Sequence, residues 1–296
     1  MRKLLSLVFA AALAMTAQAQ FLGWLEVGDY YNPLETYNAS YFDMAPTNFY
    51  LAHTGAQMIY TPDLLTAMDG KEGVQIKYLN FKFYNETYEE IVRNAKVYLQ
   101  EIDATEFAVN EDGVKQFFPL GELVAEGRYD LDLLDSYGED MALVMEIQQP
   151  FAFTQGHSLL VTIVFDAEDD DNCTMGSDYA PFYTSGIRGK AMTYTDNWNS
   201  FLDYVEGDQF PNATVMHGCG TNVELPVTEI GYTYERLCGD VNGDGYVNIT
   251  DVISLINYVA GSVPNEFYEV NANINEDAEI NITDVVLLIN IVSNEA

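Results

Sequence analysis

The chain has 296 residues, of which 48% are hydrophobic and 20% charged, so it can form one large and one small domain with packed cores. Its 46 acidic residues against 12 Lys and Arg give a formal net charge of −34. Such a polyanion is repelled by nucleic acids and by anionic lipids, which excludes both classes as expected partners.

Residues 1–19 are typical of a signal peptide. Arg2 and Lys3 precede the apolar run LLSLVFAAALAM, and the small residues Ala17 and Ala19 mark a cleavage site. We therefore expect a secreted, extracellular or cell-surface protein whose first mature residue is Gln20. No later stretch reaches the roughly 18 apolar residues of a membrane span.

Residues 20–228 are predicted to form a β-domain. Seven short runs rich in β-branched and aromatic residues are bounded by Gly, Asn, Asp or Pro, and they lie at 56–61, 74–83, 95–102, 117–127, 140–147, 157–166 and 190–195. No long helical stripe interrupts them, which indicates an antiparallel β-sandwich. In the run 74–83 the apolar alternation changes phase between Tyr78 and Leu79, which predicts a β-bulge or a strand that changes face.

Three stretches of this domain resemble jelly-roll-like β-sandwich domains of secreted proteins from anaerobic Gram-negative bacteria. They read KYLNFKF, AKVYLQEI followed by ATEF, and MEIQQPFAFTQGHSLLVTIVFD. The resemblance implies an adhesive or carbohydrate-associated accessory domain.

No sequence motif in this domain points to catalysis. His53, His157 and His217 are too far apart to suggest a zinc site, and no nucleophile elbow, P-loop or dinucleotide fingerprint occurs. A glycosidase needs only two facing carboxylates, which a chain with 46 acids can supply. We therefore expect a non-catalytic protein, and keep a polysaccharide-degrading glycoside hydrolase as the alternative.

Two features of the β-domain suggest ligands. The acidic run Asp166, Glu168, Asp169, Asp170 and Asp171 is either a calcium site or, more commonly, a solvated loop. Aromatic rings among polar side chains in 177–186 and 194–204 suit a sugar, whose apolar face stacks on a ring. The candidates are Tyr179, Tyr183, Trp198 and Tyr204, and the alternative is that these rings pack beneath long loops.

Three cysteines, Cys173, Cys219 and Cys238, would meet an oxidising environment after export. A disulfide between Cys219 and Cys238 would tie the β-domain to the C-terminal region. The alternative is that these thiols stay free.

After an expected linker at 229–237, the segment DVNGDGYVNITD has the spacing of a calcium loop. Oxygen-bearing side chains occupy places one, three, five, nine and twelve, the seventh residue offers its carbonyl, and Gly245 allows the sharp turn at place six. The predicted ligands are Asp240, Asn242, Asp244, Tyr246, Asn248 and Asp251. The apolar residues of VISLINYVAG follow at helical spacing, so the loop opens a helix.

The same construction returns 33 residues later, in NINEDAEINITD followed by VVLLINIVS. Its predicted ligands are Asn273, Asn275, Asp277, Glu279, Asn281 and Asp284. Neither loop is preceded by a full helix, so the two motifs are half EF-hands that bind one or two Ca²⁺ ions. The first loop has three carboxylates and the second two, and it should fill first. The alternative is that each turn only caps its helix.

This duplicated motif resembles the type I dockerin domain. The resemblance implies two antiparallel helices, a calcium ion in each loop, and a helix face that docks on a cohesin domain of a partner. Ile249 and Thr250, repeated as Ile282 and Thr283, match the specificity positions, and their identity implies two docking orientations related by a half turn. The departures are Asn273 for Asp, Ala278 for Gly, and Asn257 with Tyr258 for a basic pair.

The predicted order is therefore a signal peptide at 1–19, a β-sandwich at 20–228, a linker at 229–237 and a dockerin-like domain at 238–296. We expect a secreted binding or adhesion protein that docks on a cohesin in the presence of calcium and is associated with a polysaccharide or cell-surface glycan. A third reading is that the tandem motif has no partner and folds against its own sandwich.

Overall fold

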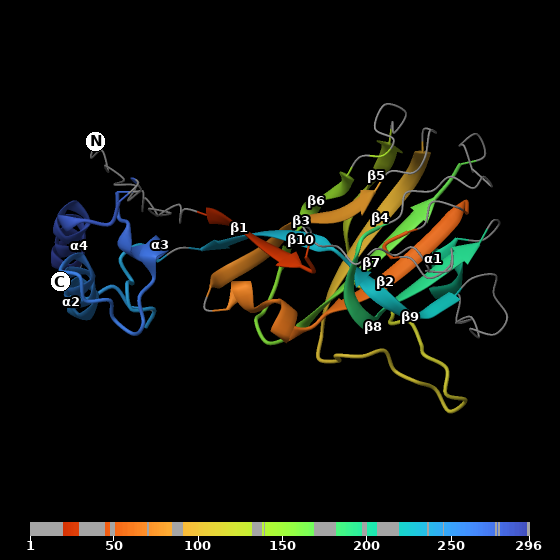
Figure 1. Cartoon of the computed structure of the whole chain (residues 1–296), viewed down its shortest axis with the longest axis horizontal. Coiled ribbons are helices and arrows are strands. Elements are labelled where there is room, and N and C mark those ends of the chain that lie inside the picture. The colour runs from red at the N-terminus through yellow and green to blue at the C-terminus, as the bar shows by residue number, and fades with distance from the viewer. Residues whose placement is uncertain are drawn as a thin grey trace, which may run out of the picture. The chain divides into compact units, whose positions relative to one another are not determined.

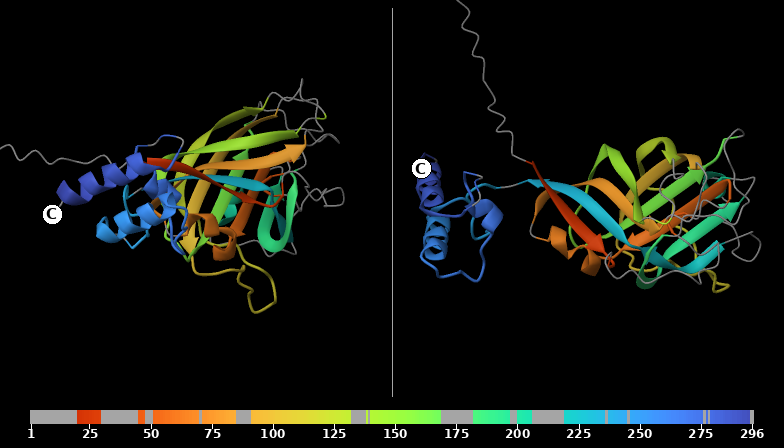
Figure 2. Two further views of the ribbon diagram at one scale, coloured as in Figure 1. Left: turned by 60° about the vertical axis from the view of Figure 1, so that its left-hand side comes forward. Right: turned by 45° about the horizontal axis from the view of Figure 1, so that its top comes forward.

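The structure is a computed structural model that describes residues 20–29, 45–47, 51–69, 71–84, 91–131, 138, 140–168, 182–196, 200–205, 219–235, 237–244, 246–275, 277 and 279–294. The chain divides into two compact units (Figures 1 and 2). One comprises Leu22–Tyr234, and the other contains Glu235–Ala296. The signal peptide prediction concerns residues outside the described ranges.

The larger unit is a sandwich of two β-sheets, as predicted. A four-stranded sheet has the order β1-β10-β3-β6, and a six-stranded sheet the order β5-β4-β7-β2-β8-β9. The strand pairs β2–β7, β2–β8, β3–β6, β4–β5, β4–β7 and β8–β9 are antiparallel. The bounds are β1 (Gln20–Val27), β2 (His53–Tyr60), β3 (Glu72–Tyr84), β4 (Ile91–Ile102), β5 (Glu122–Leu131), β6 (Asp140–Ala152), β7 (Ser158–Asp166), β8 (Thr184–Asp196), β9 (Cys219–Pro226) and β10 (Thr228–Glu235).

The main core lies between the two sheets, and a second cluster covers the outer face of the six-stranded sheet. Phe107 and Phe117 from the loop after β4, and Phe201 from α1 (Phe201–Val205), pack against that outer face. The strands β2 and β7 are therefore buried on both faces. This explains why the sequence of β7 is almost continuously apolar instead of alternating.

The predicted bulge is present. The register of β3 against β6 shifts between Ile76 and Tyr78, so that Ile76 and Leu79 both point into the core although they are an odd number of positions apart. A hydrogen bond between the hydroxyls of Tyr60 and Thr228, 2.8 Å long, links β2 to β10. Because it joins strands of different sheets, it ties the two layers together, and burial raises the pKa of the Tyr60 phenol far above its ordinary value.

Each of the seven predicted strands overlaps an observed one, but three details differ. β5 begins at Glu122 and not at 117, because the side-chain amide of Gln57 bonds both the N–H (2.7 Å) and the C=O (2.9 Å) of Phe118. The prediction missed β1 and β9. It also placed a linker at 229–237, whereas residues up to Glu235 belong to β10.

The smaller unit is helical, with α2 (Ile249–Val259), the single turn α3 (Glu269–Ala272) and α4 (Ile282–Asn294). The helices α2 and α4 lie side by side (Figures 1 and 2). Their separate core is built from Val241, Val252, Leu255, Ala272, Val285 and Leu288. Only one turn of helix precedes the second loop, in agreement with the half EF-hand interpretation.

The helices of the described ranges are all too short or too polar to span a membrane. The side chain of Cys219 lies outside the described residues, as does Cys173, so the disulfide between Cys219 and Cys238 stays a prediction.

Candidate metal centre and docking face

The two predicted loops have nearly the same hydrogen-bonded construction. In the first, Asp251 is fully buried. Its Oδ1 accepts from the backbone N–H groups of Val241 (2.8 Å) and Asn242 (3.1 Å), and its Oδ2 accepts from that of Asn248 (2.8 Å). Asp284 bonds the N–H groups of Ile274, Asn275 and Asn281 in the same way. The twelfth residue therefore closes each loop onto its start.

The ninth residue begins each helix. Asn248 Oδ1 accepts from the N–H of Thr250 at 2.8 Å, and Asn281 Oδ1 accepts from the N–H of Thr283 at 2.8 Å. Together with the bond from Asn248 N–H to Asp251, this is a capping box. The loops therefore cap their helices, and capping is compatible with metal binding because each carboxylate oxygen has two lone pairs. Asp251 Oδ2 uses one of its two lone pairs to accept from the N–H of Asn248.

Short turns between side chain and backbone orient the middle of the first loop. Asp240 Oδ1 accepts from the N–H groups of Gly243 (2.8 Å) and Asp244 (3.1 Å), Asn242 Oδ1 from that of Asp244 (3.0 Å), and Asp244 Oδ1 from that of Tyr246 (2.9 Å). The amide of Asn242 also donates to Asp244 Oδ2 at 3.0 Å. The side chains at places one, three and five are thus held on the inside of one turn.

The second loop repeats these bonds at places three and five, where Asn275 Oδ1 accepts from Asp277 N–H (3.1 Å) and Asp277 Oδ1 from Glu279 N–H (2.8 Å). It differs at place one. Asp240 accepts backbone N–H groups, whereas Asn273 donates its amide to the carbonyl of Asp277 at 2.5 Å. The second loop therefore keeps its shape with one carboxylate fewer.

The charge of this unit favours a cation in both loops. Residues 237–296 include five Asp and five Glu but no Lys, Arg or His. The buried carboxylates of Asp251 and Asp284 each accept three backbone N–H groups, but no basic side chain in this segment neutralises their charge, so a cation in the loop would stabilise it. Among the residues described, no three His, Cys, Asp or Glu side chains gather as a metal site. A calcium shell would therefore need the Asn and backbone oxygens as well, and these are ligands that Ca²⁺ accepts.

Two residues that were not predicted as part of the site, Gly243 and Tyr268, shape the first loop. Gly243 has a φ of +73°, and a Cβ there would lie 2.2 Å from the ring of Tyr268. The N–H of Tyr268 donates to the carbonyl of Val241 at 2.9 Å, so the segment before α3 packs directly on the loop. The Asn242-Gly243 dipeptide was an available signal, because this pair favours a tight turn. Gly245 and Ala278 lie outside the described residues.

The apolar stripe predicted for each helix is divided between two faces. Val252 and Leu255 of α2 are buried in the core, as are Val285 and Leu288 of α4. The neighbouring apolar residues are 43% to 64% exposed, and they repeat at the 33-residue spacing: Ile249, Ile253 and Ile256 on α2, and Ile282, Val286 and Ile289 on α4. We call these six residues the docking face. Thr250 and Thr283 are exposed beside it.

Tyr258, where the family pattern has a basic residue, is engaged within the unit. Its ring stacks on Phe267 with centroids 4.1 Å apart and planes 3° from parallel. Its hydroxyl donates to Glu269 Oε1 at 3.0 Å, and this bond raises the pKa of the phenol. The contact fixes the end of α2 against the segment that leads to the second loop.

The four aromatic candidates of the sandwich are not brought together by the described residues. Tyr179, Trp198 and the side chain of Tyr204 lie outside them. Tyr183 is partly buried, and its hydroxyl donates to Asp140. These residues remain a prediction.

The described part of the acidic run is held by protein partners. Asp166 Oδ1 lies 2.8 Å from His53 Nδ1, and Asp166 Oδ2 accepts from the hydroxyl of Ser200 at 3.0 Å. Glu168 bonds Asn94 (2.8 Å) and lies 3.5 Å from Arg128. The two carboxylates thus have different partners, and Asp169, Asp170 and Asp171 lie outside the described residues.

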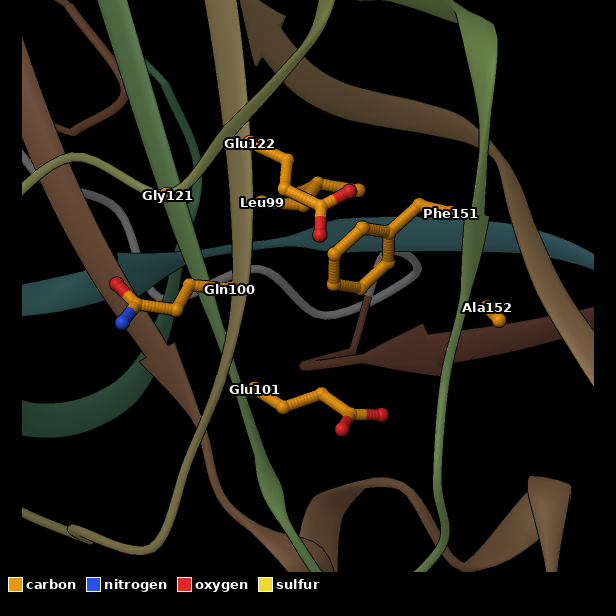
Figure 3. A pocket seen from close by; sticks show the side chains of 7 residues that line it. All are labelled: Leu99, Gln100, Glu101, Gly121, Glu122, Phe151 and Ala152. Carbon is orange, nitrogen blue, oxygen red and sulfur yellow. The ribbon is translucent and has the colours of Figure 1, made fainter.

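A pocket of about 370 Å³ lies at the edge of the sandwich where β4, the start of β5 and the end of β6 meet. Figure 3 shows its seven lining residues: Leu99, Gln100, Glu101, Gly121, Glu122, Phe151 and Ala152. The side chains of Glu101, Glu122 and Phe151 point into the same space. Glu101 also accepts a hydrogen bond from the N–H of Thr154. The pocket therefore combines two carboxylates with an apolar wall.

One family model matches the C-terminal unit. Residues 238–293 match the family described as "Dockerin type I domain". Among solved structures, a chain of the CaDoc0917–CaCohA2 complex is 35% identical, and the match covers 20% of this chain and 100% of that chain with a TM-score of 0.20. No curated protein matches the chain.

Proposed function

Residues 238–293 are a type I dockerin domain, and we propose that this domain attaches a secreted, non-catalytic β-sandwich to a cohesin-bearing partner in the presence of calcium. The sandwich would then be displayed as a binding or adhesion domain associated with a glycan. The attachment makes this a component of a larger extracellular assembly.

The docking face is the observation that carries this proposal. Six isoleucine and valine side chains on one unit are left 43% to 64% exposed, although each helix already supplies a separate set to the core. Exposed apolar residues grouped in this way are a sign of a protein interface. The face also contains no charged residue, so its complement on the partner should be mainly apolar.

Calcium would act on this face through the loops. Ile249 and Ile282 are the first residues of α2 and α4, and they directly follow the ninth loop residues Asn248 and Asn281. Ligands at places nine and twelve thus bracket the start of each helix. Holding them fixes the position of both helix ends, and the energy of metal binding becomes part of the folding energy of the unit.

The test is capture of a cohesin domain from envelope proteins by the full chain, in calcium and in excess chelator. We expect capture in calcium and its loss in chelator. The matched control is a variant with Ile253→Asp and Val286→Asp, which should fail in calcium as well. Capture that persists in chelator would contradict the calcium mechanism, and capture that survives both substitutions would contradict the docking face.

A glycoside hydrolase is the second candidate, and the pocket with Glu101 and Glu122 is the observation that favours it. If the sandwich is catalytic, release of reducing ends from soluble polysaccharides should fall by at least about 100-fold in Glu122→Gln. Glu126→Gln, on the exposed part of β5, is the control and should be unaffected. Activity that is absent from the wild type, or unchanged in Glu122→Gln, would remove this candidate.

A further inference from the structure

The outer face of the four-stranded sheet carries a pair of stacked rings, of which Trp24 is exposed and Tyr78 is partly buried. Trp24 on β1 and Tyr78 on β3 have centroids 5.7 Å apart and planes within 18° of parallel. The two strands are not neighbours, because β10 lies between them. The adjacent residues Leu25 and Leu79 point into the core, so Trp24 and Tyr78 are on the opposite side of the sheet.

A glycine of the sheet lies directly against this ring pair. Gly231 lies on β10 between the two strands, and a Cβ there would be 2.9 Å from Trp24 Cζ3 and 3.0 Å from Tyr78 Cβ. Gly231 does not have a positive φ, so no backbone turn requires a glycine at this position. A glycine inside a strand weakens it. What Gly231 allows is the close approach of the indole to the sheet.

The indole ring is held against the sheet but is not covered. Trp24 remains 49% exposed, and Leu22 on the same face of β1 and Val144 on β6 are exposed as well. Polar groups lie beside them. Glu146 pairs with Tyr78 in the β3–β6 register. Lys82 Nζ lies 3.2 Å from Glu229 Oε2, which also accepts from the amide of Asn80 at 3.3 Å.

We propose that this ring pair, which we call the Trp24 platform, is a binding site for a neutral polysaccharide. The flat rings would stack on the apolar faces of the sugar residues, while Glu146 and Glu229 accept hydrogen bonds from hydroxyls and Lys82 donates one. The chain's net charge of −34 opposes a polyanionic glycan. The inference deepens the proposed binding role of the sandwich, and it names residues that differ from the four aromatic candidates of the sequence.

The test measures binding of the full chain to three soluble neutral polysaccharides: a β-glucan, a xylan and a galactomannan. The chain has two Trp residues, so Trp198→Phe leaves Trp24 as the sole tryptophan reporter. We expect a polysaccharide that retards the protein in affinity electrophoresis also to shift the fluorescence of Trp24. Trp24→Ala should weaken retardation by at least about tenfold.

Two further variants separate the platform from general effects on folding. Gly231→Ala keeps both rings but places a methyl group against the indole, so it should also weaken binding while the melting temperature stays within a few degrees. Leu123→Ala removes an exposed side chain from β5 of the other sheet and should bind as the wild type does.

Four results would overturn the proposal, three of them in the binding measurements and one in the oligomeric state. The wild type binds none of the three polysaccharides, or Trp24→Ala binds as well as the wild type, or binding disappears in chelator. The last result would place the signal in the calcium unit, because the platform contains no calcium ligand. Conversely, polysaccharide binding that persists in chelator while cohesin capture is lost supports both proposals separately. If Trp24→Ala alters only the oligomeric state, the rings serve self-association and the proposal is wrong.

Discussion

At the scale of single residues, the two predicted calcium loops differ mainly at their first place. Asp240 accepts two backbone N–H groups and adds a carboxylate, whereas Asn273 donates to the carbonyl of Asp277. The closing residues Asp251 and Asp284 have equivalent bonds. Since calcium affinity rises with the number of charged ligands, the loops should be unequal although their shapes agree.

We predict two calcium sites of different affinity in titration calorimetry. Asp240→Asn should weaken the tighter site by about tenfold, or ~1.4 kcal/mol, and Asn273→Asp should strengthen the weaker site by a similar factor. Asn265→Asp adds the same charge at an exposed position outside both loops, so it controls for the general effect of charge. Two equal sites in the wild type, or heat from none, would contradict the ranking.

At the scale of elements, α2 and α4 each present apolar side chains on two sides. One side forms the core of the unit and the other forms the docking face. The two exposed sets repeat with a spacing of 33 residues, so Ile253 corresponds to Val286 and Ile256 to Ile289. A face that repeats in this way can offer a partner equivalent contacts from either helix.

We predict that a single substitution on one helix leaves the docking residues of the other helix able to bind the partner. Ile253→Asp or Val286→Asp alone should change cohesin affinity by less than about threefold, while the double variant should lose at least about 100-fold, or ~2.7 kcal/mol. Leu255→Ala is the comparison for a core position, and it should lower the stability of the unit by about 2–5 kcal/mol. If either single variant already abolishes binding, the partner uses one orientation only.

At the scale of the whole molecule, the two units have separate cores and separate sources of stability. The sandwich buries a large apolar core between two sheets, and nothing in that core involves the loops. The C-terminal unit has a core of only six buried residues, together with buried carboxylates that favour a cation. Its stability should therefore depend on calcium, and that of the sandwich should not.

We predict two calorimetric transitions for the full chain, of which only one responds to chelator. At a free calcium concentration of 100 times the dissociation constant, a single site stabilises the folded unit by about 2.7 kcal/mol. Removal of calcium should lower the melting temperature of the smaller transition and leave the larger one in place. A helical unit whose circular dichroism and melting temperature are the same in chelator would disprove the calcium mechanism, and a joint shift of both transitions would show that the units fold together.

Local spacing in the sequence determined seven of the strands, the bulge near Ile76, the two loops and the helices that follow them. These features depend on residues within about a dozen positions of one another, such as the oxygen-bearing side chains of one loop or the alternation along one strand. The dockerin family could be identified for the same reason, because its motif is contiguous and occurs twice.

The tertiary structure decided which apolar residues remain exposed at the surface. Leu255 and Ile256 both belong to the apolar stripe that the sequence predicts for this helix. Only the packing of α2 on α4 decides that Leu255 is buried and Ile256 is exposed. Gln57, 61 residues away in the sequence, bonds the backbone of Phe118, and the strand expected from 117 begins only at Glu122. Trp24 and Tyr78 meet because β10, which comes last in the sandwich, inserts between β1 and β3 with a glycine at the contact. Contacts of this kind join distant parts of the chain, and no local pattern encodes them.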